Sequence, residues 1–304
     1  MVLCSLVLLA ATASGQTKPA SPIVAGYLPT WRLGRSSYKD FAGLSDVIVF
    51  SAVPMSTGEL DTSGIDSEKL AILQEQKAAY GYRTLLTVGG WGRSGEFSTI
   101  CKTATTRTKF IAGIKKYLTD NDFDGVDYSW ETPSSTQDQQ SYTKLILETD
   151  TAFKKTKLRL TAKVPAFLNL PKAAWTALDA IHVSSYDHPG AHSTLPDAER
   201  DLDLLASKGA PKGKLVLGIP FYGRSLLDAS KTMSYSEIFK QFRPDKGVDE
   251  AGDFSFNGID TVKKKAGLVK LTGIGGVMIW ELGQDAPGSD SLLKAILTIV
   301  KAKR

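Results

Sequence analysis

Eight short apolar segments, alternating with stretches of helical periodicity, are the feature that most constrains how this chain can fold. The apolar segments are residues 23–28, 47–53, 84–90, 125–130, 158–164, 180–186, 215–221 and 275–280. The clearest helical stretches are residues 66–81, 106–122, 195–209 and 290–304. Each apolar segment has the length of one buried strand. Strands that alternate with helices predict a parallel sheet, because a crossover helix must return the chain to the start of the next strand.

Eight strand–helix units are the number that a closed (β/α)8 barrel requires, so the predicted fold is a single α/β TIM barrel. A doubly wound open sheet is the alternative. No G-x-G-x-x-G motif follows a predicted strand, which argues against a dinucleotide-binding form of that alternative. In a barrel, functional side chains gather at the C-terminal ends of the strands.

The N-terminus has the pattern of a secretory signal peptide. Residues 2–13 form an apolar run, and small residues follow it. Signal peptides combine such a run with a cleavage site of small residues. We therefore expect residues 1–15 to be a removed signal and residues 16–304 to form the barrel. The mature protein would be extracellular and begin between Ser14 and Thr17.

Cysteine content, charge and hydropathy limit the partners. Cys4 lies in the expected signal, so Cys101 would be the only cysteine of the mature chain and no internal disulfide could form.

The net charge is +5, but no Lys/Arg cluster interleaves with aromatic residues, so we expect no nucleic-acid partner. The N-terminal apolar run is too short for a membrane span, and we expect no membrane partner. We expect a monomer.

Polar and aromatic residues gather at the predicted strand ends. Asp127, Ser129 and Glu131 share one face of their strand, because residues two apart point the same way. A barrel core needs no polar atoms there, so several strand ends of this kind indicate a site. The strand-end residues are Tyr27, Trp31, Gly89, Gly90, Trp91, Asp127, Ser129, Glu131, Tyr186, Asp187, Tyr222 and Trp280.

Aromatic rings around a pair of carboxylic acids suggest a sugar-binding site. Sugar rings present apolar C–H faces that stack on Trp and Tyr, and a carboxylic acid can protonate a glycosidic oxygen. A metal site is not expected, because the chain has only three histidines. His182 falls inside a predicted strand and is interpreted as a core residue. His188 and His192 are interpreted as residues of a surface loop.

Residues 123–131, FDGVDYSWE, resemble the fourth-strand signature D-G-x-D-x-D-W-E of glycoside hydrolase family 18, the chitinase family. The resemblance extends along nearly the whole mature chain and implies a (β/α)8 barrel. The other matching segments, in chain order, are AGYLPTW (25–31), TVGGWG (87–92), SSYD (184–187), LGIPFYGRS (217–225) and GGVMIWELGQDA (275–286). Ser184 stands where the sixth-strand motif of the family has Met.

The resemblance implies roles for individual residues. Glu131 corresponds to the general acid and Asp127 to the inner aspartate. Tyr186 corresponds to the tyrosine that hydrogen-bonds the substrate acetamido group, and Trp280 to the floor of the sugar subsite. The residues implied as groove or supporting residues are Tyr27, Trp91, Asp187, Tyr222 and Arg224. The family's second aspartate, two residues before the acid, is absent, and Ser129 stands there.

That departure concerns the mechanism that the resemblance implies. Family members use the substrate acetamido oxygen as the nucleophile and form an oxazolinium ion. The missing carboxylate orients the acetamido group, offsets the developing positive charge and, as a like-charge neighbour, helps to keep the acid protonated. Serine carries no charge. Losing one such group typically costs about 3 kcal/mol at the transition state, or roughly a hundredfold in rate.

Two functions remain open at this point. The first is a chitinase-like protein that binds chitin or N-acetylglucosamine oligosaccharides with absent or strongly reduced hydrolysis, since stacking does not need a carboxylate at position 129. The second is an active retaining endo-chitinase in which Glu131 is the acid and Asp127 takes over part of the missing role. Ser129→Asp should raise hydrolysis about a hundredfold if the serine is the only defect.

The resemblance also implies what the chain lacks. About fifty residues separate the FYGRS and GIGGVM segments, too few for the large α+β domain that some relatives insert there. The groove would then be shallower, with an endo-like mode of binding. We expect no separate carbohydrate-binding module after residue 304, and therefore binding of soluble oligomers rather than of crystalline chitin. No cofactor and no metal is implied.

Overall fold

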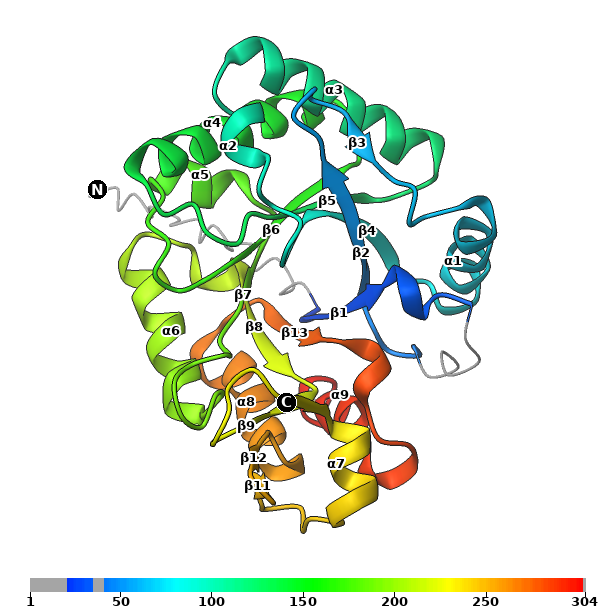
Figure 1. The fold of residues 1–304 in the computed structure, drawn as a ribbon, viewed down its shortest axis with the longest axis vertical. Coiled ribbons are helices and arrows are strands. Elements are labelled where there is room, and N and C mark those ends of the chain that lie inside the picture. The colour runs from blue at the N-terminus through cyan, green and yellow to red at the C-terminus, as the bar shows by residue number, and fades with distance from the viewer. Residues whose placement is uncertain (1–20, 35–40, 303–304) are drawn as a thin grey trace, which may run out of the picture.

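The computed structural model describes residues 21–34 and 41–302, so the expected signal peptide lies outside the described residues. Parallel strands form a closed ring with helices around it (Figure 1). The ring consists of β1 (Ile23–Pro29), β2 (Asp46–Pro54), β4 (Arg83–Gly89), β5 (Gly125–Ser129), β6 (Arg159–Val164), β7 (Ala180–Val183), β8 (Leu215–Pro220) and β13 (Gly276–Trp280). Strand β1 pairs with both β2 and β13, and this closes the barrel. The predicted TIM barrel is confirmed, and the open sheet is excluded.

Helices follow the strands and cover the outside of the ring. The helices are α1 (Ser67–Tyr80), α2 (Phe97–Ile100), α3 (Ala104–Asp120), α4 (Thr136–Phe153), α5 (Lys172–Ala177), α6 (Leu195–Ser207), α7 (Tyr235–Phe242), α8 (Ile259–Thr272) and α9 (Leu292–Val300). Four of them, α1, α3, α4 and α6, have an N-cap side chain that accepts a hydrogen bond from a backbone N–H of the first turn. These N-cap residues are Asp66, Thr103, Ser135 and Thr194. Short 3-10 helices lie at Thr30–Arg32, Lys212–Lys214, Leu282–Gln284 and Gly288–Asp290.

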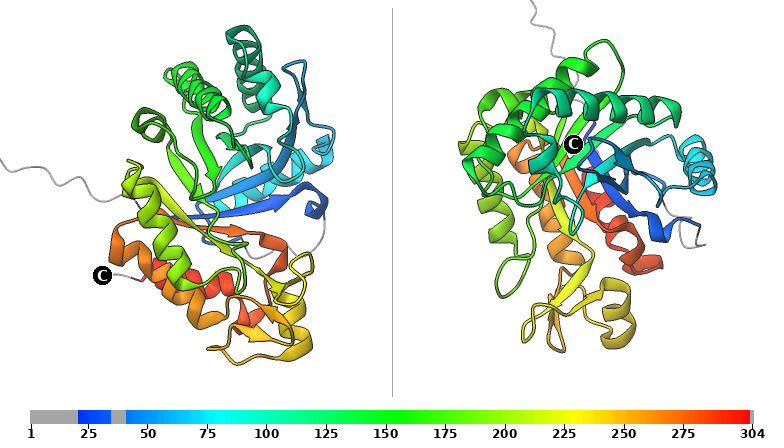
Figure 2. Two further views of the ribbon diagram at one scale, coloured as in Figure 1. Left: turned by 60° about the vertical axis from the view of Figure 1, so that its left-hand side comes forward. Right: turned by 45° about the horizontal axis from the view of Figure 1, so that its top comes forward.

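A small antiparallel sheet is inserted between β8 and α8. Its strands are β9 (Tyr222–Ser225), β10 (Thr232–Ser234), β11 (Glu250–Ala251) and β12 (Phe254–Ser255). Their order is β10-β9-β12-β11, and helix α7 follows β10. Both views in Figure 2 show this unit beside the barrel rather than over it. In the described part of the chain no large inserted domain is present, as predicted. One further two-residue strand, β3 (Leu60–Asp61), pairs with β2.

The barrel strands alternate between an inner and an outer core. Along β5, Val126 and Tyr128 belong to the outer hydrophobic cluster, between the strands and the helices. Asp127 and Ser129 take the alternate positions. The inner apolar cluster consists of Ala25, Tyr27, Ile48, Phe50, Leu85, Ala180, Val216 and Met278. The polar groups described below therefore lie on the inner face of the barrel.

No helix within residues 21–34 and 41–302 is long and apolar enough to cross a membrane.

Candidate active site

Asp127 is the most deeply buried acid of the site, with 0% of its surface exposed. Its Oδ2 accepts a hydrogen bond of 2.7 Å from the Tyr27 hydroxyl on β1. Its Oδ1 accepts one of 2.7 Å from the Thr161 hydroxyl on β6 and lies 2.9 Å from Nδ1 of His182 on β7. Burial, and then the Asp127 charge, raise the pKa of Tyr27 well above its ordinary value, so its hydroxyl stays a donor. Both Asp127 oxygens are therefore engaged by neighbouring strands.

Ser129 and Glu131 are joined to each other and to a lysine. The Ser129 hydroxyl, on a residue that is 1% exposed, donates a hydrogen bond of 2.9 Å to Oε1 of Glu131. Lys163, on β6, places Nζ 2.8 Å from the same oxygen and 3.1 Å from Oε2. The side chains of Lys163 and Glu131 are 11% and 25% exposed. Glu131 thus accepts hydrogen bonds on both oxygens and remains open to solvent on one side.

Aromatic rings form the inner wall beside these acids. Trp280, at the end of β13, is partly buried. Its ring centroid lies 5.4 Å from that of Tyr27 and 4.9 Å from that of Phe50, the latter in an edge-to-face arrangement at 83°. Such contacts fix the plane of the indole ring. Phe50 itself meets the ring of Trp31 edge to face, with centroids 6.1 Å apart.

The Tyr186 hydroxyl is shielded from solvent and has no hydrogen-bond partner among the described residues. Burial raises the pKa of Tyr186 well above its ordinary value, and the nearby charges of Glu131, Asp187 and Asp127 raise it further. The hydroxyl is therefore a proton donor without an acceptor. A buried polar group of this kind is costly to leave unpaired, so Tyr186 has an unused hydrogen bond to offer to a ligand.

Asp187 joins the end of β7 to the small sheet. Its Oδ1 accepts a hydrogen bond of 2.6 Å from the Tyr222 hydroxyl and lies 3.3 Å from Nη1 of Arg224. Burial raises the pKa of Asp187, but His192, Tyr222 and Arg224 outweigh that effect and lower it below its ordinary value. The ring of Tyr222 also meets that of Tyr186 edge to face, at 6.3 Å. The structure thus links Tyr186 to these supporting residues.

Trp91 differs from the other predicted groove residues because it is 84% exposed. It lies in the turn that follows β4, whose last residue, Gly89, has a φ of +90°. A Cβ at Gly89 would lie 2.5 Å from the Phe97 ring and 2.7 Å from the Ser129 carbonyl oxygen, so only glycine fits this close approach to β5. Trp91 therefore presents its ring to solvent and not to the buried cluster.

One of the three histidines, His192, is placed differently from the prediction. His192, which was interpreted as a residue of a surface loop, is 0% exposed, with its ring 5.0 Å from that of Tyr222. The loop packs against Tyr222 of β9, a contact that the local sequence does not reveal. His188 is partly exposed and contacts Asp201 at 3.0 Å. His182 is buried, as predicted, and is a partner of Asp127. No group of residues suited to a metal ion is found within the described ranges.

Two residues of strand β6 lie at the site although the strand-end pattern does not indicate them. Thr161 and Lys163 lie two positions apart, and they contact Asp127 and Glu131 respectively. The register of β5 and β6 pairs Asp127 with Thr161. A lysine at an inward position of an otherwise apolar strand was the available signal, because such a position rarely holds a charge without a partner.

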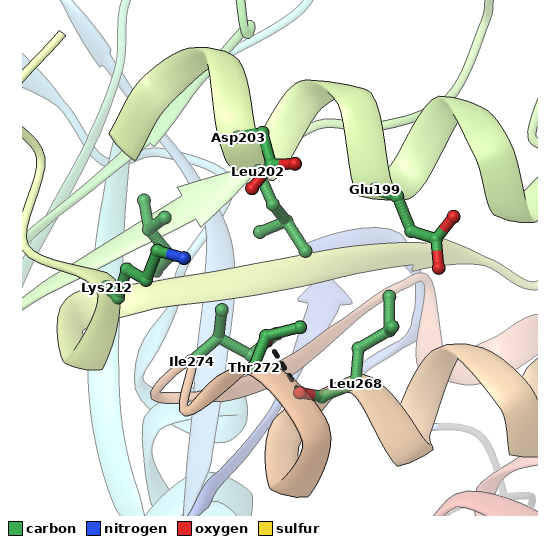
Figure 3. Close-up of a pocket in the computed structure, with 8 residues that line it drawn as sticks. Glu199, Leu202, Asp203, Lys212, Leu268, Thr272 and Ile274 are labelled. Carbon is green, nitrogen blue, oxygen red and sulfur yellow. Dashed lines mark hydrogen bonds between the residues drawn. The ribbon is translucent and has the colours of Figure 1, made fainter. Parts of the chain in front are cut away.

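A cavity of about 220 Å³ lies between α6, α8 and the start of β8 (Figure 3). Its lining includes Leu215, the first residue of β8, and Ile274, just before β13. The cavity therefore lies at the N-terminal ends of the strands. Since the candidate site occupies their C-terminal ends, this cavity is not part of it.

Comparison with known proteins identifies the family. The pattern of "Glycosyl hydrolases family 18" matches residues 23–285. Chitotriosidase-1 of Mus musculus is 29% identical over 274 residues, covering 67% of this chain and 58% of that protein. This chain therefore spans little more than half the length of that relative.

Solved structures agree with this result. The chitinase ChiB of Flavobacterium johnsoniae matches with a TM-score of 0.82 and 26% identity, covering 92% of this chain and 94% of that chain. YKL-39, solved in the presence of chitooligosaccharides (GlcNAc4), shares the fold, with a TM-score of 0.78 and 22% identity over 92% of this chain and 100% of that chain. The chain belongs to glycosyl hydrolase family 18.

Proposed function

We propose that this protein is a secreted chitinase-like protein that binds chitin oligosaccharides and hydrolyses them slowly or not at all. The observation that carries the proposal is Ser129, which contacts Glu131 at 2.9 Å and stands where the resembling family signature has an aspartate. Family membership supports the substrate class. The N-terminal apolar run supports the location outside the cell.

Binding is supported by groups that need no carboxylate at position 129. The Trp280 ring, fixed against Tyr27 and Phe50, offers a flat apolar face for a sugar ring. The unpartnered Tyr186 hydroxyl offers a hydrogen bond to a carbonyl oxygen such as that of an acetamido group. Stacking and this hydrogen bond act on the ground-state sugar. They therefore contribute to affinity but do not lower the barrier to hydrolysis.

Slow hydrolysis is supported by the chemistry of the serine. A hydroxyl at position 129 can position Glu131 and can accept one hydrogen bond. It cannot offset the positive charge of an oxazolinium ion, nor act as the like-charge neighbour that favours a protonated acid. The expected loss is about 3 kcal/mol of transition-state stabilisation, or roughly a hundredfold in rate.

The alternative is an active retaining endo-chitinase with Glu131 as the general acid. The presence of Glu131, partly open to solvent, favours it. It requires Asp127 to take over part of the role of the missing aspartate. Asp127 is 0% exposed and accepts from Tyr27 and Thr161, so it would first have to give up existing hydrogen bonds. This cost argues for the binding protein.

One experiment separates the two functions. Binding of an N-acetylglucosamine tetramer is measured by calorimetry, and hydrolysis of the same tetramer is followed beside an active family member. We expect binding in the micromolar range, roughly −8 kcal/mol, with turnover at least about a hundredfold below that of the relative. Turnover comparable to the relative would establish the chitinase. A folded sample that binds no chitin oligomer would refute the binding protein.

A further inference from the structure

We propose that Lys163 is a positioning residue that holds Glu131 in its carboxylate form, so that the site lacks a general acid for a second reason, separate from Ser129. The inference rests on the proposed function and deepens it. It concerns a residue on a different strand from the family signature, and it changes what restoring the signature alone can achieve.

The geometry of Glu131 is that of an acceptor on both oxygens. Lys163 Nζ donates to Oε1 at 2.8 Å and to Oε2 at 3.1 Å, and the Ser129 hydroxyl donates to Oε1 at 2.9 Å. A general acid must instead carry a proton on one oxygen and direct it at the leaving group. A proton on either Glu131 oxygen would disrupt the charge-assisted hydrogen bond which that oxygen accepts from Lys163. The positive charge of the Lys163 ammonium would also oppose the added proton. The observed contacts therefore favour the carboxylate.

Burial and strand pairing restrict Lys163 to a position from which it contacts Glu131. Its side chain is only 11% exposed, and it comes from β6, which is hydrogen-bonded to β5 in fixed register. An ion pair with one largely buried partner is screened less by water and salt than a surface pair. Removing one partner of such a pair leaves the other charge uncompensated. The two side chains therefore stabilise each other's charged forms.

The other titratable groups around Glu131 are three tyrosines and Asp127, and none of them is a cation. Tyr27, Tyr142 and Tyr186 interact electrostatically with Glu131, and burial raises the pKa of each well above its ordinary value, so they stay neutral. The carboxyl group of Asp127 is engaged by Tyr27, Thr161 and His182. Among the described residues, Lys163 is the cation in contact with Glu131.

This arrangement predicts an incomplete rescue by Ser129→Asp. A new carboxylate at position 129 would lie next to the Lys163 ammonium as well as Glu131. The ammonium would then compensate both negative charges, and the like-charge effect that keeps an acid protonated would be weakened. Full recovery should require removing the cation as well. The two substitutions should therefore act together and not as independent steps.

The test compares hydrolysis of a chitin tetramer by Ser129→Asp, Ser129→Asp/Lys163→Met and Ser129→Asp/Lys163→Arg. Methionine keeps the length of the side chain and removes the charge, whereas arginine keeps the charge. We expect the Met double variant to exceed Ser129→Asp by about tenfold or more in kcat. It should also keep its activity to higher pH, because the alkaline limb reports loss of the acid proton. The Arg double variant should resemble Ser129→Asp. Lys116→Met, made in the same Ser129→Asp background, is the control for loss of a positive charge. Lys116 is an exposed lysine of α3, so this substitution should leave the kcat of Ser129→Asp unchanged.

A second measurement avoids dependence on the folding of Ser129→Asp. In the wild-type background, the infrared carbonyl band of the Glu131 carboxylic acid, identified by its loss in Glu131→Gln, should grow in Lys163→Met at mildly acidic pH. It should not grow in Lys163→Arg. An unchanged band, or a Met double variant no faster than Ser129→Asp, would overturn the inference. Calorimetry on the wild type keeps the two proposals apart, because a wild type that binds no chitin oligomer would refute only the proposed function.

Discussion

Tyr27 on β1 donates a hydrogen bond of 2.7 Å to Oδ2 of Asp127 on β5, across the interior of the barrel. Both residues are 0% exposed. The bond joins strands that are not neighbours in the ring, since β4 and β2 lie between them. It therefore ties the buried acid of the site to the opposite part of the barrel wall.

Tyr27→Phe should destabilise the protein by about 2 kcal/mol, because hydrogen bonds to charged groups contribute more than neutral ones and a buried acceptor is left with fewer donors. Urea unfolding measures the change. Tyr128→Phe is a matched control, since Tyr128 is equally buried but bonds the neutral hydroxyl of Thr149 at 2.9 Å. Tyr128→Phe should lower the free energy of unfolding by about 1 kcal/mol. Equal losses in the two variants would argue against a charged acceptor.

Trp280→Ala should weaken binding of an N-acetylglucosamine tetramer by about tenfold or more, because a stacking surface is lost. Calorimetry gives the affinity, and a thermal melt shows that the variant is folded. Leu271→Ala removes an apolar side chain that is 80% exposed on α8, away from the C-terminal ends of the strands, and should bind as the wild type does. Unchanged affinity in Trp280→Ala would exclude Trp280 as the floor of a sugar subsite.

Lys265 should make stability depend on pH. Burial lowers the pKa of this lysine from 10.5 to about 7. Between pH 7 and 10.5 the unfolded chain therefore binds more protons at this residue than the folded protein, so the free energy of unfolding rises with pH across that window. Below the lower value both states are protonated, and the slope vanishes.

The slope should approach about 1.4 kcal/mol per pH unit at most. It is measured as the difference in unfolding free energy between the wild type and Lys265→Met over this pH range. Lys265→Met also removes hydrogen bonds to Ser193 and Asn257, but that loss shifts the curve without giving it a slope. The neighbouring exposed Lys264→Met should run parallel to the wild type. A pH-independent difference would show that Lys265 titrates normally.

The N-terminus provides a separate prediction. If residues 1–15 are a secretory signal, the mature protein should be recovered from the medium and begin between Ser14 and Thr17. Mass spectrometry of the purified native protein reads the first residue directly. Native protein that retains Met1 would contradict secretion through this signal.

The sequence by itself determined the barrel and the strand ends. All eight predicted strands are present, because a buried parallel strand needs a continuous apolar run and these runs are separated by turn residues. The helices α1 (Ser67–Tyr80) and α3 (Ala104–Asp120) also lie close to their predicted ranges. Helix α4 (Thr136–Phe153) was not singled out, since polar residues fill much of its sequence and its packing on β5 and β6 is not visible locally.

Only the tertiary structure decided which side chains meet. The period of a strand places Asp127, Ser129 and Glu131 on one face, but it says nothing about the strand alongside. The register of β5 with β6 brings Lys163 to Glu131, and closure of the ring brings Tyr27 to Asp127. Protonation states depend on such contacts, because a charge within hydrogen-bond distance outweighs anything the local sequence can contribute. The chemistry of the site is therefore a property of the closed barrel, although its residue types are written in the sequence.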